Sequence, residues 1–368
     1  SHPNGLTILR VDHPQSDSAL GFFDTPGKAR AVATDGALAL VADSSGGLQI
    51  VDVRDPSAPV GLGTIATTDS TFSVDLVGAT AYIINWTKGL SIVDVGDPSA
   101  PVLLGTLDTT NFVYSVKVVG TIAYIANGTN GLLIVDVSDP TSPIVLSVMD
   151  TPSTARDVVV SGSIACVADD RSGVQIIDVN DPSAPVLMGS LDTPGIARGV
   201  ALTGSMLFVA DHSQGMQIID IADPSAPVLR GTFQTSSNAN GVAVENSLVY
   251  LAAGAGGLLI VDVSDPAAPE LLASFDLPDN TIGLAVRGEL AYLANGAEGL
   301  MIVDVSDCDC AADFNGDGFV DLADYQQFES CFSSPTPSQT CLDRFDADHD
   351  GDLDMSDYAN FQNEYTGL

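Results

Sequence analysis

The segment Gly47-Leu48-Gln49-Ile50-Val51-Asp52-Val53, followed by Asp55-Pro56-Ser57-Ala58-Pro59, decides the fold because it recurs along the chain. Its aspartate returns at a constant interval of 42 residues. The seven copies are Asp52, Asp94, Asp136, Asp178, Asp220, Asp262 and Asp304. Self-similarity at a period of roughly 20–50 residues is typical of solenoids and propellers. We therefore treat the chain as a seven-fold repeat.

Each repeat contains four short runs rich in Val, Ile and Leu, which predict four strands. In the fifth repeat the predicted strands are 198–203, 205–210, 216–221 and 228–233. A glycine opens the link between the first two strands in six repeats, and Asn246 does so in the sixth repeat. Both residue types accept the positive φ of a tight hairpin. Four strands per repeat of about 40–45 residues indicate an all-β, seven-bladed β-propeller of four-stranded blades.

The two ends of the repeat region predict how the ring closes. The last repeat stops after its third strand, at Val305, while residues 19–25 copy a fourth strand. We expect residues 19–25 to supply the missing outer strand of the last blade. Residues 5–11 copy a third strand and are then one strand too many. They are either displaced or belong to an eighth blade cut short upstream, and we favour seven blades.

The repeat phrase resembles the LVIVD repeat of bacterial and archaeal surface proteins. The matching words are Leu133-Ile134-Val135-Asp136 and Leu259-Ile260-Val261-Asp262, with looser copies elsewhere. The resemblance covers roughly residues 5–307 and implies a propeller at the cell surface. We assign residues 1–307 to the propeller, 308–312 to a short linker that contains cysteines, and 313–368 to a separate module.

Charge and hydropathy exclude several classes of partner. The formal net charge is −36, with 12 Lys+Arg against 48 Asp+Glu. Nucleic acids and anionic membrane surfaces would be repelled, and cations are the natural partners. No apolar run is long enough to cross a bilayer, so we expect no membrane insertion.

One face of the propeller is predicted to carry the variable loops, which follow the second and fourth strands. If the first strand is innermost, its opening residue lines the mouth of the central channel on that face. These residues are Arg30, Phe72, Tyr114, Arg156, Arg198, Asn240 and Ile282. Arginine and aromatic side chains suit contacts with a carboxylate, a sugar or a peptide.

A structural role competes with ligand binding at these arginines. The hairpin register places Asp43, Asp169 and Asp211 opposite the three arginines, and no other repeat has aspartate there. This pattern predicts a cross-strand ion pair in three blades. We favour structural pairing over ligand binding for these arginines. The aspartate of the third strand, repeated seven times, is predicted to hydrogen-bond a neighbouring turn.

Two twelve-residue segments near the C-terminus have the spacing of calcium loops. A loop of this kind takes ligands from positions 1, 3, 5, 7, 9 and 12, with glycine at position 6. Gly318 and Gly351 occupy position 6. The predicted ligands are Asp313, Asn315, Asp317, Phe319 (by its carbonyl), Asp321 and Asp324 in the first loop, and Asp346, Asp348, Asp350, Asp352 (by its carbonyl), Asp354 and Asp357 in the second. Hard oxygen donors favour Ca²⁺ over zinc, so we expect two calcium ions.

The paired loops depart from an ordinary EF-hand, because position 12 is Asp and no helix precedes the first loop. Helices are predicted after each loop, at 325–331 and 358–364. Duplicated loop–helix units of this kind resemble dockerin modules, over roughly residues 311–366. The resemblance implies a small α-helical, calcium-binding domain outside the cell and a cohesin-like or surface-anchoring partner. The segment between Cys331 and Cys341 is similar to dockerin-like tails of planctomycete surface proteins.

Four of the five cysteines fall within residues 308–341, and such clustering in an exported module suggests disulfides. Cys331 with Cys341 is the preferred pair, although Cys308 and Cys310 are also available to bridge to them. Cys166 lies in a predicted strand and is expected to be a buried, small hydrophobic residue.

Two functions fit these features. The first is a secreted or cell-surface scaffold whose propeller binds a protein or polysaccharide and whose tail docks through calcium. The second is a secreted polysaccharide-active enzyme, a glycoside hydrolase or lyase, that carries a dockerin. No asymmetric set of carboxylates, His or Ser breaks the repeat in the manner of a catalytic site, so we favour the non-enzymatic scaffold.

Overall fold

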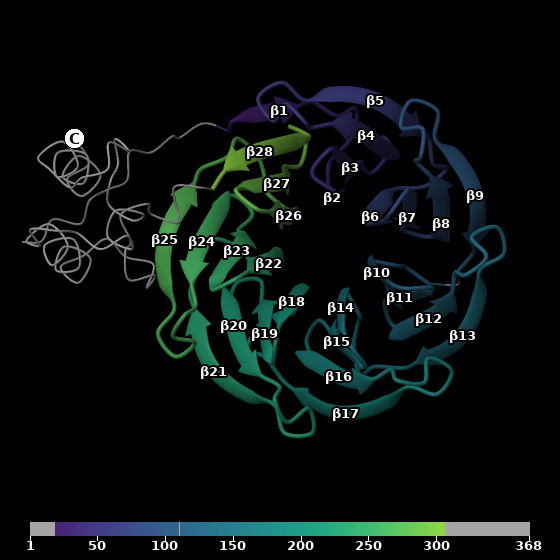
Figure 1. Ribbon diagram of the computed structural model, residues 1–368. Coiled ribbons are helices and arrows are strands. Elements are labelled where there is room, and N and C mark those ends of the chain that lie inside the picture. Colours follow the sequence, from purple (N-terminus) through teal and green to yellow (C-terminus); the bar gives the residue numbers. More distant parts are fainter. Residues whose placement is uncertain (1–18, 110, 306–368) are drawn as a thin grey trace, which may run out of the picture. The chain divides into compact units, whose positions relative to one another are not determined.

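Twenty-eight strands form seven separate four-stranded antiparallel sheets in the part of the chain that the computed structural model describes, residues 19–109 and 111–305. Figure 1 shows these sheets as blades around a common axis. We number the blades by the order of their first strands. The strand order within a blade follows the sequence, except in the blade that closes the ring.

The bounds of the strands follow the 42-residue period. The first strands are β2 (Ala31–Thr34), β6 (Thr71–Val77), β10 (Ser115–Val119), β14 (Asp157–Ser161), β18 (Gly199–Thr203), β22 (Gly241–Glu245) and β26 (Gly283–Arg287). The second strands are β3 (Leu38–Ala42), β7 (Thr80–Asn85), β11 (Ile122–Ala126), β15 (Ile164–Ala168), β19 (Met206–Ala210), β23 (Leu248–Ala252) and β27 (Leu290–Ala294). The third strands are β4 (Leu48–Asp52), β8 (Gly89–Asp94), β12 (Leu132–Asp136), β16 (Val174–Asp178), β20 (Met216–Asp220), β24 (Leu258–Asp262) and β28 (Leu300–Asp304). The outer strands are β5 (Val60–Ile65), β9 (Val102–Leu107), β13 (Ile144–Met149), β17 (Val186–Leu191), β21 (Val228–Phe233), β25 (Glu270–Phe275) and β1 (Gly21–Phe23).

The first strands are innermost, which is the condition on which the predicted channel-lining residues depended. Each first strand contacts the first strands of both neighbouring blades, which closes a ring around the axis (Figure 1). The second and third strands are almost wholly buried, because neighbouring blades cover both faces of each sheet. This explains why their sequences are continuous apolar runs and not alternating ones. The outer strands are largely exposed.

The hydrophobic core lies between blades, not within them. In the cluster that joins blades 7 and 1, for example, Val41 and Val51 pack with Tyr292 and Ile302. Blades 4 and 5 share a similar cluster, which includes Cys166. Cys166 is free and fully buried, which confirms the prediction made for it. A single blade exposes both of its faces, so the ring is the smallest unit that buries this surface.

The N-terminal strand closes the ring, as predicted. β1 pairs antiparallel with β28, and Phe22 lies opposite Met301 in this register. Blade 7 therefore has the order β1-β28-β27-β26 and is made from both ends of the propeller region. Phe23 packs on the core cluster of blades 7 and 1. We call residues 19–25 the strap.

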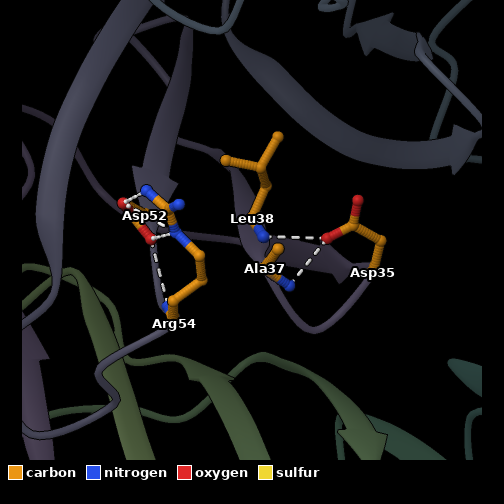
Figure 2. Close-up of polar contacts among 5 residues, drawn as sticks. All are labelled: Asp35, Ala37, Leu38, Asp52 and Arg54. Atoms are coloured by element: carbon orange, nitrogen blue, oxygen red, sulfur yellow. Dashed lines mark hydrogen bonds and ion pairs between the residues drawn. The ribbon is translucent and has the colours of Figure 1, made fainter.

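The hairpins and Asp-Pro turns lie on one face of the ring, the turn face, which comprises residues 35–37 and 53–59 in blade 1 and their equivalents. The hairpin glycines have positive φ, for example 57° at Gly162, and Asn246 has a φ of 55°. In blade 1, Asp52 accepts hydrogen bonds from the backbone N–H and the guanidinium of Arg54, while Asp35 accepts from the N–H groups of Ala37 and Leu38 (Figure 2). The Arg54 guanidinium and backbone hold the pKa of Asp52 down to about 2.

The repeated third-strand aspartates bond the turn that follows them, as predicted. Asp136 and Asp178, for example, accept from the backbone N–H two residues further on, at 2.8 Å in each case. The outer strands contact the Asp-Pro turn of the next blade. A Cβ built at Gly63 or Gly231 would overlap the carbonyl oxygen of a turn proline, Pro98 or Pro266.

The predicted calcium loops, their helices and the surplus strand 5–11 lie outside the described residues. Within the described part of the chain, no helix has the length and apolar character needed to cross a membrane.

Candidate functional site

The face opposite the turn face, which we call the loop face, carries the loops after the second and fourth strands (residues 43–47 and 66–70 in blade 1 and their equivalents). The predicted ligand residues stand here, one position before each first strand, except Phe72, which is the second residue of β6. In most blades the hydrogen-bond ladder between the first and second strands extends by one bond to include the backbone of this residue. The N–H groups of Arg30, Arg156, Arg198 and Asn240 donate to the alanine carbonyls that end the second strands, at 2.8–2.9 Å. Their side chains therefore start from fixed backbone at the inner edge of the ring.

The predicted cross-strand ion pairs are wrong. Asp43, Asp169 and Asp211 are fully buried, and their carboxylates face the loop that enters the blade from the preceding outer strand. Asp169 accepts from the hydroxyl of Thr151 at 2.7 Å and from the N–H of Ser153 at 3.1 Å, and the other two aspartates make equivalent bonds. Burial raises the pKa of all three carboxyl groups. Their role is to fasten the loop, and they do not neutralise the arginines.

The residue one position later is the one that meets the arginine. Arg156 pairs with Asp170, with Nε 2.7 Å and Nη2 2.6 Å from Oδ2. The Nε of Arg30 donates to the hydroxyl of Ser44 at 3.0 Å. Ser44 and Asp170 have φ of 44° and 49°, in the left-handed region that few side-chain-bearing residues adopt. The two-residue hairpin register continues only to the end of the second strand, and this left-handed residue then turns the chain towards the next blade.

Position 44 and its equivalents also link neighbouring blades. His212, for example, exchanges two backbone hydrogen bonds with Ala239 of the next blade, at 3.1 and 3.0 Å. Six of the seven positions have φ between 44° and 57°. Trp86 in blade 2 is the exception among them, because its φ is not positive. It is also the only tryptophan of the chain.

Trp86 organises an aromatic column that the repeat pattern did not predict. Its ring stacks on Phe72, with centroids 5.2 Å apart and planes at 9°, and on Phe112, at 4.7 Å and 27°. Phe72 also meets Tyr114 edge-on at 6.2 Å. The indole Nε1 is buried and has no hydrogen-bond partner. Phe112 ends the column and remains 47% exposed.

Two guanidinium groups lie over rings of this aromatic cluster. The Cζ of Arg30 lies 4.1 Å from the centre of the Phe72 ring, and that of Arg156 lies 5.1 Å from the Tyr114 ring. Partly desolvated contacts of this type are worth roughly 1–2 kcal/mol each. A continuous row of cationic and aromatic side chains thus runs from blade 1 to blade 4. We call it the arginine–aromatic row: Arg30, Phe72, Trp86, Phe112, Tyr114 and Arg156.

Arg198 in blade 5 continues this row but lacks a carboxylate. Its Nη1 donates to Oδ1 of Asn240 at 3.1 Å, while its Nε is buried with no partner. Burial lowers the pKa of Arg198 and the nearby charge of Arg156 lowers it further, while the nearby carboxylate of Asp170 acts in the opposite direction. The pKa of His212 is lowered by burial and then by the same two arginines, so its imidazole is neutral at pH 7. Among the described residues, the ion pairs are Arg54–Asp52, Lys117–Asp75, Arg156–Asp170 and Arg230–Asp220, so no carboxylate lies within ion-pair distance of Arg30 or Arg198.

Two carboxylates at the inner edge of the ring hold neighbouring first strands together. Asp75 accepts from the N–H of Val118 at 2.7 Å and pairs with Lys117 at 3.1 Å. Asp157 accepts from the Ser115 hydroxyl at 2.6 Å and from the Val200 N–H at 3.0 Å. Because the innermost strand has an unpaired edge, these side chains satisfy N–H groups that the sheet leaves open. At the position of Asp75 the other repeats have Ala or Val, apart from Lys117, which is its ion-pair partner, and at the position of Asp157 they have Gly, Ala or Ser. A charged residue at an otherwise small or apolar repeat position is the signal by which these two aspartates were identifiable.

The predicted metal ligands of the two calcium loops and the Cys331–Cys341 pair lie outside the described residues. In residues 19–109 and 111–305, no group of three or more His, Cys, Asp or Glu side chains is placed to hold a metal. The exposed end of the aromatic column borders a shallow hollow of about 160 Å³, lined by Thr87, Thr109, Asn111 and Phe112.

The ring of seven four-stranded blades, with its irregular side chains gathered on one face, defines a seven-bladed β-propeller. The LVIVD repeat model matches seven consecutive segments, at residues 26–67, 70–109, 113–151, 152–193, 194–235, 236–277 and 280–308. These matches cover well over half of the chain, which therefore belongs to the LVIVD repeat family. Residues 311–364 match the dockerin type I domain, a domain that generally binds calcium. The comparison with curated proteins found no match.

Solved structures share the fold at low sequence identity. A chain of the mitotic checkpoint complex aligns with a TM-score of 0.68 and 13% identity, covering 83% of this chain and 96% of that one. The computationally designed protein Ika8 aligns with a TM-score of 0.59 and 9% identity, covering 78% and 99%. Sqt1 of Saccharomyces cerevisiae aligns with a TM-score of 0.62 and 8% identity, also covering 78% and 99%. At these identities the likeness concerns the propeller fold alone.

Proposed function

We propose that this protein is a secreted or cell-surface scaffold. Its propeller binds a polysaccharide or protein on the loop face, and its tail docks to a cohesin-like or surface-anchoring partner. The dockerin match supports a binding or scaffold role, because dockerins typically bind cohesins and occur in extracellular proteins. The propeller supplies a second, rigid binding surface in the same chain.

The observation that carries the proposal is the one-sided break in the repeat. The turn face repeats the same hydrogen bonds from blade to blade, which is what a structural surface requires. On the loop face the blades differ from one another. Blades 1 to 5 carry the arginine–aromatic row and Arg198, whereas blade 7 has Ile282 at the repeat position that Arg30 occupies in blade 1. Structural needs are the same in every blade, so a surface that departs from the repeat in one sector reflects a ligand that is not symmetric.

The tail contributes calcium-dependent docking in this proposal. The twelve ligands of its two loops, Asp313 to Asp324 and Asp346 to Asp357, are carboxylate, amide or backbone carbonyl oxygens. This donor set suits Ca²⁺, which takes six to eight oxygen ligands. The proposal assigns residues 308–312 to a linker and Cys331 with Cys341 to a disulfide in the module.

An array of polysaccharides and surface proteins tests the propeller. We expect wild-type protein to bind at least one member, and Arg156→Ala to lose that binding while the chain stays folded, with a melting temperature lowered by roughly a few degrees because the pair with Asp170 and the contact with the Tyr114 ring are lost. Arg54→Ala is the matched control, because Arg54 is also ion-paired with an aspartate but lies on the opposite, turn face. Equal binding by both variants would show that the propeller does not bind its ligand on the loop face.

Calorimetry of the full chain tests the tail. Two Ca²⁺ per chain are expected, and binding to a cohesin should disappear when calcium is chelated. A stoichiometry of zero contradicts the loop assignment. Release of new reducing ends from a polysaccharide, abolished by one carboxylate substitution, would instead establish the enzymatic alternative.

A further inference from the structure

We propose that the outer edge of blade 3, formed by β13, binds an extended segment of another protein whose apolar centre is flanked by basic residues. The segment adds to β13 as a fifth strand of the blade. This surface lies on the rim of the ring, which the outer strands form, and it is separate from the loop face (Figure 1). The inference therefore goes beyond the proposed function.

The edge of β13 is open to pairing. β13 is the last strand of its sheet and pairs with β12 alone. Within the described part of the chain, no segment other than β12 forms a backbone hydrogen bond with residues 144–149. Such an edge presents N–H and C=O groups to another extended chain. The Ser147 hydroxyl donates to the carbonyl of Pro182 in the turn of blade 4 at 2.6 Å, so the edge is held in place before a ligand arrives.

β13 is also the outer strand least protected against pairing. Charged residues protect an edge strand, and glycine weakens one. Among the described outer strands, β13 alone has neither: β21 has Arg230, β25 has Glu270, and β1, β5, β9 and β17 contain glycine. A bulge at Leu146 interrupts the ladder with β12, but blades 1 to 6 share this bulge, so it does not distinguish β13.

The exposed side chains of β13 are apolar. Ile144, Val145 and Val148 are 59%, 46% and 54% exposed. At the position of Val148, five blades have Thr or Ser, and blade 7 has Phe22. The fold therefore does not require an apolar side chain there. Exposed apolar groups gathered beside an unpaired strand edge are typical of a surface that binds another protein.

The charges at the two ends of β13 specify the ends of the ligand. Asp136 lies opposite Ile144, Asp139 lies in the turn before β13, and Asp150 follows the strand. A backbone hydrogen bond lowers the pKa of Asp136 and a hydroxyl hydrogen bond lowers that of Asp139, so both are ionised at pH 7. The ion pairs of the described residues include none of these three aspartates. Lys or Arg at both ends of the ligand complements them, whereas a second copy of this chain would add negative charge.

The test uses the fluorescent peptide Lys-Lys-Val-Thr-Val-Thr-Val-Lys-Lys, whose alternating centre has one apolar face as a strand. Fluorescence anisotropy measures its binding to the full-length protein, and we expect one peptide per chain. In two control peptides, the four lysines are replaced by glutamate or the five central amide nitrogens are methylated. Both should bind at least about tenfold more weakly, because the first reverses the charges and the second removes the donors of the ladder.

Substitutions on the rim locate the site. Val148→Lys should weaken binding by about fivefold or more, because it removes an apolar contact and repels the basic ends of the peptide. Thr106→Lys, at the same position of blade 2, should leave binding unchanged. Asp150→Asn should weaken binding roughly two- to threefold, whereas Asp276→Asn, its equivalent in blade 6, should not. Urea unfolding checks that all four variants are folded.

Several outcomes would overturn the inference. They are no binding of the parent peptide, equal binding of the methylated peptide, unchanged binding by Val148→Lys, and more than one peptide per chain. Dimerisation of the wild-type protein that Val148→Lys abolishes in sedimentation velocity would assign the edge to a second copy instead. Arg156→Ala should bind the peptide like wild type, so the rim and the loop face can fail independently of each other.

Discussion

Replacing Phe23 with alanine tests whether the strap holds the ring closed. Phe23 is half-buried, packs on the core shared by blades 7 and 1, and lies against the backbone of Gly61. A fully buried Phe→Ala change costs about 3–5 kcal/mol. Taking roughly half of that for a half-buried ring, we expect a loss of about 2 kcal/mol in the free energy of unfolding.

The adjacent residue provides the control. Phe22 belongs to the same strand but points outward and is 65% exposed, so Phe22→Ala should change the free energy of unfolding by less than about 0.5 kcal/mol. Urea unfolding followed by circular dichroism measures both variants against wild type. Equal effects of the two substitutions, or no effect of either, would show that the strap does not contribute to the closure of the ring.

Three further predictions concern Asp211, Gly231 and Cys166. Burial raises the pKa of Asp211, so protonation of its carboxyl adds stability as pH is lowered from 7 towards about 4, and this contribution is lost as pH rises through the folded pKa. In urea titrations, the difference in unfolding free energy between wild type and Asp211→Asn should therefore grow as pH is lowered over that range. A difference that stays constant with pH would contradict this prediction. Gly231→Ala should lower the free energy of unfolding by about 1–3 kcal/mol, because the new methyl group overlaps the carbonyl oxygen of Pro266; an unchanged urea midpoint would argue against the outer-strand contact. Burial raises the pKa of the Cys166 thiol to about 12, so iodoacetamide at pH 8 should leave Cys166 unmodified in the native protein and alkylate it in urea. Peptide mass spectrometry measures the modification, and labelling of the native protein would refute the burial of Cys166.

The repeat period predicted most of the fold because the blade is a local structure. The hairpin glycines, the turn-bonding aspartates such as Asp136 and the four strands depend on residues close in sequence. The strap was also predictable, since residues 19–25 supply the one strand that the last repeat lacks.

The loop face was only partly predictable. The repeat placed Arg156 at the opening of an innermost strand, where the structure has it. The hairpin register then paired Arg156 with Asp169, because that register was continued past the end of the second strand. The left-handed conformation of Asp170 brings its carboxylate to the arginine, and no periodic pattern signals that conformation in a residue other than glycine. Trp86 was missed for a related reason: its stacking joins two blades, and its partner Phe112 lies in the loop before the next first strand.

The construction of blade 7 has a mechanical consequence. The chain leaves the propeller directly after β28, which is hydrogen-bonded to β27 on one side and to β1 on the other. If the tail tethers the protein to a surface, a pulling force enters the ring through this strand and must break two ladders at once, one of them formed by the opposite end of the propeller. A tether on an outer strand would peel away a single ladder, whereas a tether on β28 distributes the same force over two.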